Sequence, residues 1–349
     1  MPKPTVARLT SPAQLVAVLP LWLGYTPTES LVVACCHEPR GRMGLTMRFD
    51  LPDAADEQAL VAEVVRRVRH QRATRVIVAV FTAEADTDRR TRAGLVDGLR
   101  HALSDLVMTE AVLVGEDRFW SYLCDVPDCC PPEGRPVSTA EGDDPVRLLE
   151  AEQILRGQVV LRDRAELEAL LSGPQLFAEE EALQRCDAAC HELAEAVRTG
   201  DRARYRERML VRWHEALDAF GAPPARLGAD EVAALAVSLA DRQLRDQLAA
   251  EDDTSAMLAL LEELCRRTPA PYDAPVCTLL AWLTYCEGGG AAVSILLERA
   301  LASDPTYSLA LLLQDVVLGQ VPPEKVRQLT QEAARGPSRR DRRRNQRAG

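Results

Sequence analysis

The sequence predicts a two-domain protein, with an α/β domain over residues 1–140 followed by an all-α domain over residues 141–335. Strand-like and helix-like segments alternate in the first part, whereas helical periodicity continues almost without interruption from Val146 onward. Between them, RPVSTAEGDDP (135–145) has the composition of a linker. The length of 349 residues supports the division, because single cores stop growing at about 250–300 residues.

The N-terminal domain is expected to open with a helix and a β-hairpin. Thr10-Ser11-Pro12 provides a hydroxyl cap and a proline for the first turn, and the helix is expected to end by Gly24, with a kink or early stop at Pro20. SLVVACC (30–36) is rich in β-forming residues, and GLTMRFD (44–50) alternates in polarity. We expect these two segments to pair as a hairpin.

Two helices and three further strands are expected after the hairpin. The helices are predicted at 56–71 and 88–106, while TRVIVAVF (74–81) and MTEAVLVG (108–115) are apolar runs typical of buried strands, and DRFWSYLC (117–124) is a short strand. Strands separated by helices favour parallel pairing with right-handed crossovers. The predicted fold is therefore an α/β domain with a mixed, mostly parallel sheet, flanking helices and a β-hairpin.

Glycine and proline clusters divide the helical domain, and its last part predicts a tetratricopeptide-like helix pair. The stretch 279–305 places small or apolar residues where two helices pack closely, with a glycine turn between the helices and a proline after them. A helical surface of this type is suited to binding a peptide or helix of a partner protein. The residues that fit the pattern are Leu280, Ala281, Gly288, Ala300 and Pro305.

The formal net charge of −11 is unevenly distributed. GPSRRDRRRNQRAG (336–349) holds six arginines and one aspartate, so the rest of the chain is strongly acidic, and we expect this tail to be disordered. An acidic body argues against nucleic-acid binding except through the tail. The apolar stretch LVAVLPLWLG (15–24) is shorter than the roughly 20 residues that a bilayer crossing takes. We therefore expect a cytoplasmic protein, without membrane attachment, whose ten cysteines are mostly reduced.

The reactive side chains are concentrated in one loop, LCDVPDCCPPEG. Cys124, Cys129 and Cys130 offer three thiols, and zinc takes up to four donors, so the loop predicts a metal site in which Asp125 or Asp128 supplies a fourth ligand. The same thiols could instead form a reversible, strained disulfide. A third interpretation is structural, with the cysteines acting as small buried hydrophobes that plug the end of the sheet.

Other candidate ligands lie outside this loop. Cys186 and Cys190 are spaced i, i+4 on one face of a predicted helix, with His191 beside them, and they would complete a metal site if the helical domain folded over the loop. The sequence contains no P-loop, Rossmann glycine fingerprint, H-E-x-x-H or G-x-S-x-G motif. The weaker candidates, each with a simpler structural explanation, are Asp50 at a strand end, His37 after a strand, and Trp213-His214-Glu215 within a helix.

Five stretches carry a family resemblance. They are LTSPAQLVAVLPLWLGYTPTESLVVA, GLTMRFDLP, RFWSYLCDVPDCCPPEG, LADRQLRDQL and APVCTLLAWLTYCEGGGAAVSILLERALASDPTYSLA. Together they resemble the actinobacterial domain-of-unknown-function 4192 family (DUF4192) over most of residues 9–320, and the cysteine loop is the most specific of them. The resemblance implies a cytoplasmic actinobacterial protein and supplies no activity. The pairs Cys35-Cys36 and Cys186/Cys190 lie outside the family pattern.

These features lead us to expect first a non-enzymatic interaction or regulatory protein that docks a partner protein through its helical domain. The alternative is a zinc-binding or thiol-redox enzyme or sensor that uses Cys124, Cys129 and Cys130, with zinc as the candidate cofactor. A minor alternative is nucleic-acid contact through residues 336–349.

Overall fold

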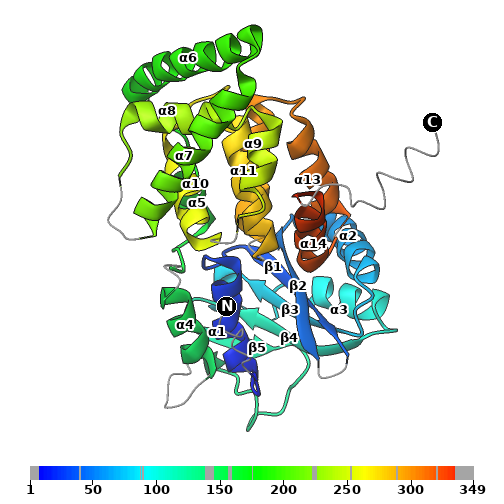
Figure 1. Cartoon of the computed structure of the whole chain (residues 1–349). Coiled ribbons are helices and arrows are strands. Elements are labelled where there is room, and N and C mark those ends of the chain that lie inside the picture. Colours follow the sequence, from blue (N-terminus) through cyan, green and yellow to red (C-terminus); the bar gives the residue numbers. More distant parts are fainter. Residues whose placement is uncertain are drawn as a thin grey trace, which may run out of the picture. The chain divides into compact units, whose positions relative to one another are not determined.

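The structure is a computed structural model, and its contacts divide the chain into two units, Met1–Glu166 and Leu167–Gly349 (Figure 1). The first unit therefore continues beyond residue 140. The Arg-rich segment 336–349, expected to be a disordered tail and a nucleic-acid contact, lies outside the described residues. The structure describes residues 8–38, 41–86, 88, 90–137, 145–155, 159–174, 176–221, 226–251, 254–287, 290–319 and 321–334.

The first unit is built on a six-stranded sheet with the strand order β2-β1-β3-β4-β5-β6. Its strands are β1 (Ser30–His37), β2 (Arg42–Asp50), β3 (Arg75–Phe81), β4 (Val107–Val114), β5 (Arg118–Ser121) and β6 (Arg135–Pro136). Its helices are α1 (Pro12–Leu23), α2 (Glu57–His70), α3 (Ala93–Ala102) and α4 (Pro145–Leu155), with short 3-10 helices η1 (Ala54–Asp56) and η2 (Ala83–Asp86).

The sheet is mixed, but it is mostly antiparallel. Among the described strands, β3 and β4 form the one parallel pair, whereas β1–β2, β1–β3, β4–β5 and β5–β6 are antiparallel. The expected hairpin of the first two strands is confirmed. The expectation of a mostly parallel sheet is wrong.

The error has a topological cause. The connection from β2 through α2 to β3 does join two strands that run in the same direction, but β1 lies between them and pairs with both. Hydrophobic runs identify buried strands without showing which strand lies next to which. Of the described helices, α3 is the one that connects adjacent parallel strands, β3 and β4.

Helices cover both faces of the sheet (Figure 1). Val64 and Val68 of α2 and Leu95 of α3 are buried in the cluster on one face. Val16 and Leu19 of α1 are buried in the cluster on the other face. Burial on both faces explains why the central strands read as almost continuous apolar runs.

Local sequence signals set the limits of α1. The Ser11 hydroxyl oxygen accepts a hydrogen bond from the backbone N–H of Gln14 at 3.2 Å, which caps the N-terminus. Gly24 ends the helix in the left-handed region, at φ 79°. Pro20 lies within the helix, which continues past it to Leu23, so the expected early stop does not occur there.

Within the described residues, the second unit is helical throughout. None of the described helices combines the length and apolarity that a bilayer crossing requires. α11 (Asp273–Cys286) and α12 (Gly290–Ser303) pack against each other where the helix pair at 279–305 was predicted, and the predicted turn residue Gly288 lies outside the described residues. The helices are α6 (Leu176–Thr199), α7 (Arg202–Phe220), α8 (Ala229–Ser238), α9 (Arg242–Leu248), α10 (Thr254–Arg267), α11 (Asp273–Cys286), α12 (Gly290–Ser303), α13 (Ser308–Leu318) and α14 (Pro323–Ala334), while α5 (Arg164–Leu170) spans the boundary between the units.

Asp241 anchors α9 to α7. Its carboxylate is fully buried and accepts hydrogen bonds from the backbone N–H groups of Gln243 and Leu244, both at 3.1 Å. The same carboxylate accepts hydrogen bonds from Nε of Arg202 at 2.6 Å and of Arg206 at 2.8 Å. The charge is thus both a helix cap and a bridge between two helices.

Arg299 forms a second polar anchor, on α12. Its Nε donates to the Asp273 carboxylate at 2.8 Å, and the Asp273 side chain is only 4% exposed. One terminal nitrogen donates to the Leu171 carbonyl at 2.7 Å and to Cys265 Sγ at 3.1 Å, and the other donates to the Thr268 carbonyl at 3.0 Å. The guanidinium therefore ties α12 to α10, to the start of α11 and to the segment after α5.

Candidate thiol and metal site

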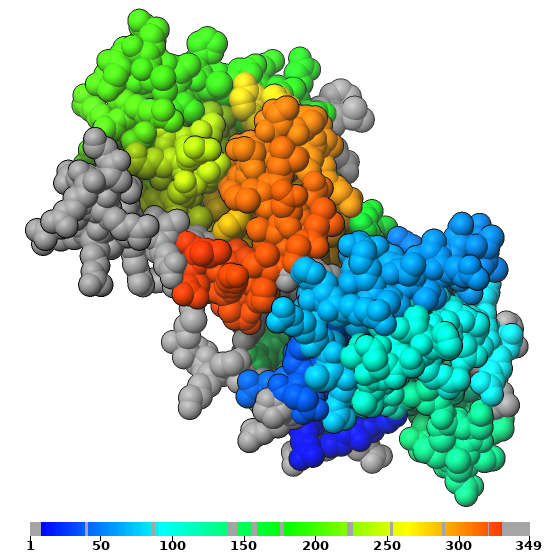
Figure 2. All heavy atoms as spheres, turned by 90° about the vertical axis from the view of Figure 1, so that its right-hand side faces the viewer, coloured from blue at the N-terminus to red at the C-terminus, as the bar shows by residue number. Residues whose placement is uncertain are grey.

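The cysteine loop begins where β5 ends, at the surface of the first unit (Figure 2). Beyond β5, the Tyr122 backbone N–H still donates to the Ala111 carbonyl of β4 at 2.8 Å. The chain then turns back, because the Val126 carbonyl accepts the N–H groups of both Cys129 (3.0 Å) and Cys130 (2.6 Å). This turn returns the second and third cysteines to the first one.

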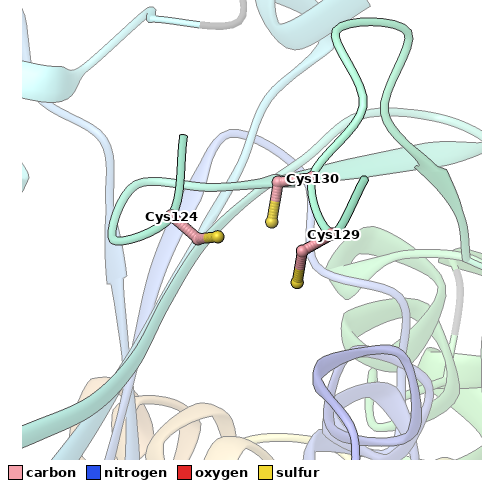
Figure 3. A group of neighbouring side chains, drawn as sticks. All are labelled: Cys124, Cys129 and Cys130. Carbon is pink, nitrogen blue, oxygen red and sulfur yellow. The ribbon is translucent and has the colours of Figure 1, made fainter. Parts of the chain in front are cut away.

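The three thiols form one cluster. The sulfur atoms of Cys124, Cys129 and Cys130 all lie within 4.8 Å of one another, and the Cys124 sulfur points toward the other two (Figure 3). In the part of the chain that the structure describes, no other group of three or more metal-binding side chains gathers in this way. Cys129 is exposed, and the other two are half-buried, so the cysteines do not fill a core as a structural plug would.

The second limb of the loop is fixed by side chains of β5. Trp120 Nε1 donates to the Pro132 carbonyl at 3.1 Å, and an Arg118 terminal nitrogen donates to the Gly134 carbonyl at 2.9 Å. Gly134 adopts φ +77°, and a Cβ at this position would lie 2.5 Å from Trp120 Cε2. Only glycine therefore fits between the indole ring and the turn. β6 then closes the loop, with Arg135 paired to Phe119.

The segment before α3 holds the first limb. Arg90 donates to the Asp125 carboxylate at 3.0 Å, and the Tyr122 hydroxyl donates to the Thr91 carbonyl at 2.7 Å. A small open pocket lies beside the sulfurs. It is lined by Arg90, Trp120, Ser121, Cys124, Asp125 and Cys130.

The pKa values of the cysteine thiols in the cluster are shifted in different directions. The Val126 backbone N–H and the Cys130 and Cys129 thiols donate to the Cys124 sulfur and lower the pKa of the Cys124 thiol. Burial, with the neighbouring sulfurs, raises the pKa of Cys130 to about 12. The two shifts have different leading causes, the Val126 N–H hydrogen bond for Cys124 and burial for Cys130, and the hydrogen bonds between the sulfurs reinforce both. The cluster is suited to one thiolate in the absence of a cation.

The two predicted aspartate ligands are not members of the sulfur cluster. The Asp125 carboxylate is engaged by Arg90 and is 76% exposed, and Asp128 is also exposed. Neither carboxylate joins the three sulfurs in the grouping described above. The structure therefore presents a set of three sulfur donors.

The helical candidates occupy a different unit from the loop. Cys186 is buried against Ala233 and Val237, and Cys190 packs against that cluster. The ring of His191 is exposed, and its Nδ1 lies 3.3 Å from the Asp187 carbonyl. These residues do not form a metal-binding group of three within the described residues.

The remaining candidates have structural partners. Asp50 is exposed and pairs with Arg48 at 2.5 Å. The His214 ring is exposed and lies 3.4 Å from the Glu251 carboxylate, whereas the neighbouring Trp213 is buried. Glu215, in the same triplet, is exposed. The ring of His37 instead packs against the backbone at Gly44, because a Cβ there would lie 2.6 Å from His37 Nε2.

Sequence reasoning missed Arg90, Trp120 and Ser121 as neighbours of the site. Trp120 and Ser121 stand immediately before the loop, so a strand running into the cysteines already placed them near it. Arg90 is separated from Asp125 by 35 positions in the sequence and belongs to the segment before α3. Its approach depends on strand order and on the path to α3, which no local pattern encodes.

The architecture is that of a protein with a mixed-sheet unit, a helical unit and a three-sulfur site on a sheet-edge loop. The family model for the domain of unknown function DUF4192 matches residues 12–324, so the chain belongs to this family. No curated protein and no solved structure matches the chain.

Proposed function

We propose that the chain is a zinc-binding protein whose ligands are Cys124, Cys129 and Cys130. The observation that carries this proposal is the convergence of three sulfur atoms within 4.8 Å of one another on a surface loop whose two limbs are each held by hydrogen bonds. One exposed and two half-buried cysteines on a surface loop add little to core packing. Binding of a soft cation would explain why the three thiols lie close together, since thiolates are ligands that zinc prefers.

The distances support a common ion. Zinc–sulfur bonds of about 2.3 Å at tetrahedral angles place the sulfurs about 3.8 Å apart. Sulfurs already within 4.8 Å of one another reach that spacing by small rotations of their side chains. The turn around Val126 leaves room for such rotations because Cys129 is exposed.

The charge balance also supports a cation. Three thiolates and a divalent ion carry a net charge of −1, and the Arg90 guanidinium lines the same pocket. With three protein donors, the fourth position of the ion is left for water or for an external ligand. Zinc sites that act in catalysis or sense a ligand keep such an open position, whereas structural sites are closed by four protein ligands. This supports an enzyme or a sensor.

The test is the zinc content of full-length protein purified without oxygen, measured by elemental mass spectrometry. We expect one zinc ion per chain, lost in C124S, C129S and C130S. The matched control is C190S, which removes a half-buried cysteine of α6 and should keep the zinc. Cobalt substitution then counts the thiolate ligands through their charge-transfer absorption. A reduced chain that neither retains zinc nor binds it in titration would contradict the proposal.

A second proposal assigns partner binding to the helical unit. Leu311, Leu312 and Leu318 of α13 are 40%, 53% and 59% exposed, which is unusual for leucines of one short helix. α11 and α12 beside it are the helices for which we propose the tetratricopeptide-like relationship, a type of helix pair that binds peptides. A partner recovered from the native host should be lost when Leu312 is changed to Glu. Retention of every partner by that variant would contradict this role for α13.

A further inference from the structure

The geometry points to Cys124 and Cys130 as a dithiol that hydroperoxides oxidise to a reversible disulfide. The oxidation itself requires only the sulfur cluster. Its regulatory consequence, release of the metal, rests on the proposed zinc site. The inference thus assigns a modification site and a class of oxidant to the loop that we propose binds zinc.

The arrangement of the sulfurs selects this pair. Cys124 and Cys130 both line the small pocket beside the loop, and the Cys124 sulfur points toward the Cys130 side chain (Figure 3). A disulfide needs a sulfur–sulfur distance of about 2.05 Å, which two sulfurs already in one cluster reach through movement of the loop alone. Cys129 is adjacent in sequence to Cys130, and a bridge between neighbouring residues strains the peptide that joins them. Cys129 does not line the pocket that Cys124 and Cys130 share, so we assign Cys129 as the thiol outside the bridge.

Accessibility restricts the reaction to this loop. The protein has ten cysteines, and six of the seven outside the loop are buried, while Cys190 is half-buried. An oxidant in solution meets the sulfurs of the loop first, since Cys129 is exposed and its two neighbours border an open pocket. The buried cysteines are Cys35, Cys36, Cys186, Cys265, Cys277 and Cys286.

The chemistry balances with a hydroperoxide as the two-electron oxidant. One thiolate of the pair attacks the terminal peroxide oxygen, the O–O bond breaks, and a sulfenic acid and an alcohol (or water) form after one proton is taken up. The second thiol displaces the sulfenic oxygen as water and forms the S–S bond. Two thiols thereby lose two electrons and two protons, and the peroxide is reduced. An external thiol reverses the bond by exchange.

Oxidation would remove two of the three zinc ligands. A single remaining thiolate, Cys129, holds zinc far more weakly than three do, so the ion leaves as the disulfide forms. Oxidation by peroxide would thus release the zinc ion and leave a loop closed by the Cys124–Cys130 disulfide. Reduction restores the three donors.

The first experiment uses reduced, metal-free, full-length protein and stoichiometric hydrogen peroxide. Trypsin leaves all three loop cysteines in one fragment, residues 119–147. We expect this fragment to lose two hydrogen atoms and to retain one thiol that can be alkylated. Further cleavage before Asp125 and Asp128 separates Cys124 from Cys130, so the two pieces remain joined only through their disulfide.

Single variants identify the pair. C129S should form the disulfide as the wild type does, whereas C124S and C130S should lose it, and C190S should behave as the wild type. Formation of the bond in C130S but not in C129S would overturn the assigned pairing. Loop thiols that survive peroxide while Cys190 is oxidised would overturn the whole inference.

The second experiment follows zinc release from zinc-loaded protein with a chromogenic chelator. We expect one zinc ion released for each equivalent of peroxide, and its recapture after a reducing thiol is added. If the metal-free chain forms the disulfide but never binds zinc, the zinc proposal fails and the oxidation site stands. If zinc binds and peroxide leaves all three thiols intact, the oxidation site fails and the zinc proposal stands.

Discussion

Gly134 shows how one backbone position controls the cysteine site. It lies in the left-handed region at φ +77°, and its missing Cβ leaves room for the Trp120 indole. The indole in turn donates to the Pro132 carbonyl, which holds the limb that carries Cys130. Gly134 is therefore needed for its backbone conformation, and it leaves the space in which the Trp120 indole packs and makes its hydrogen bond.

We expect Gly134→Ala to lower the free energy of unfolding by about 2–3 kcal/mol, because left-handed backbone strain adds to a clash with Trp120. Urea unfolding measures the change. The matched control is Gly41→Ala, since Gly41 has φ +60° and nothing within 4 Å of its would-be Cβ, so it carries only the backbone cost of about 1 kcal/mol. Equal losses in the two variants would show that Trp120 does not confine Gly134.

Arg299 supports a residue-scale prediction in the helical unit. Replacing it with Met leaves the Asp273 carboxylate, 4% exposed, without its cation, which should cost about 3–5 kcal/mol of unfolding free energy. The control is Arg266→Met, because Arg266 pairs with Glu263 on the same helix and is 41% exposed, so its loss should cost less than about 1 kcal/mol. Similar unfolding midpoints for the two variants would contradict the prediction.

At the scale of elements, Asp241 determines how α9 is held. Burial alone would raise the pKa of this carboxyl, but the hydrogen bonds from Arg202, Leu244 N–H and Arg206 outweigh it and leave the pKa below its ordinary value. A carboxyl with a lowered folded-state pKa stabilises the fold above its unfolded pKa of about 4. That stability is lost as the pH falls through the folded-state pKa.

We therefore expect Asp241→Asn to be destabilised relative to the wild type at pH 7, by about 3 kcal/mol, because two arginines lose their buried partner. The gap should shrink as the pH falls below about 4, where the wild-type carboxyl also loses its charge. Chemical unfolding at a series of pH values, with Asp246→Asn as the exposed control, measures both effects. A gap that stays constant down to the acid limit would refute the electrostatic origin.

The order of the strands marks the limit of prediction from the sequence at this scale. The β-forming residues of SLVVACC predicted β1, apolar runs predicted β3 and β4, and the alternation in GLTMRFD predicted β2, because those patterns reflect burial of each strand's own faces. The insertion of β1 between β2 and β3 is a relation between distant segments, so the sequence predicted parallel neighbours where the structure has antiparallel ones. The sulfur cluster was predictable for the opposite reason, since its members lie within seven residues. Arg90 was not.

At the scale of the molecule, the boundary between the two units has a consequence for fragments. α4 packs on α1, with Val18, Leu21 and Val146 buried together and Gln153 donating to the Leu21 carbonyl at 2.8 Å. The linker composition before α4 suggested that the first domain ends at residue 140, but these contacts tie the following helix to it.

A fragment ending at residue 166 should therefore be more stable than one ending at residue 140. The shorter fragment exposes Val18 and Leu21, and uncovering two aliphatic side chains costs about 3 kcal/mol. Parallel urea unfolding of the two fragments measures the difference. Coincident transitions would show that α4 adds nothing to the first unit.

The closure of the cysteine loop also bears on aggregation. β6 consists of Arg135 and Pro136, and a short edge strand with a charge and a proline resists the addition of a strand from another molecule. The same two residues pair with β5 and so complete the frame of the sulfur site. Any change that detaches this limb uncovers the longer edge of β5. Loop variants such as Gly134→Ala should for this reason self-associate more readily than the parent chain, which light scattering at increasing concentration would detect.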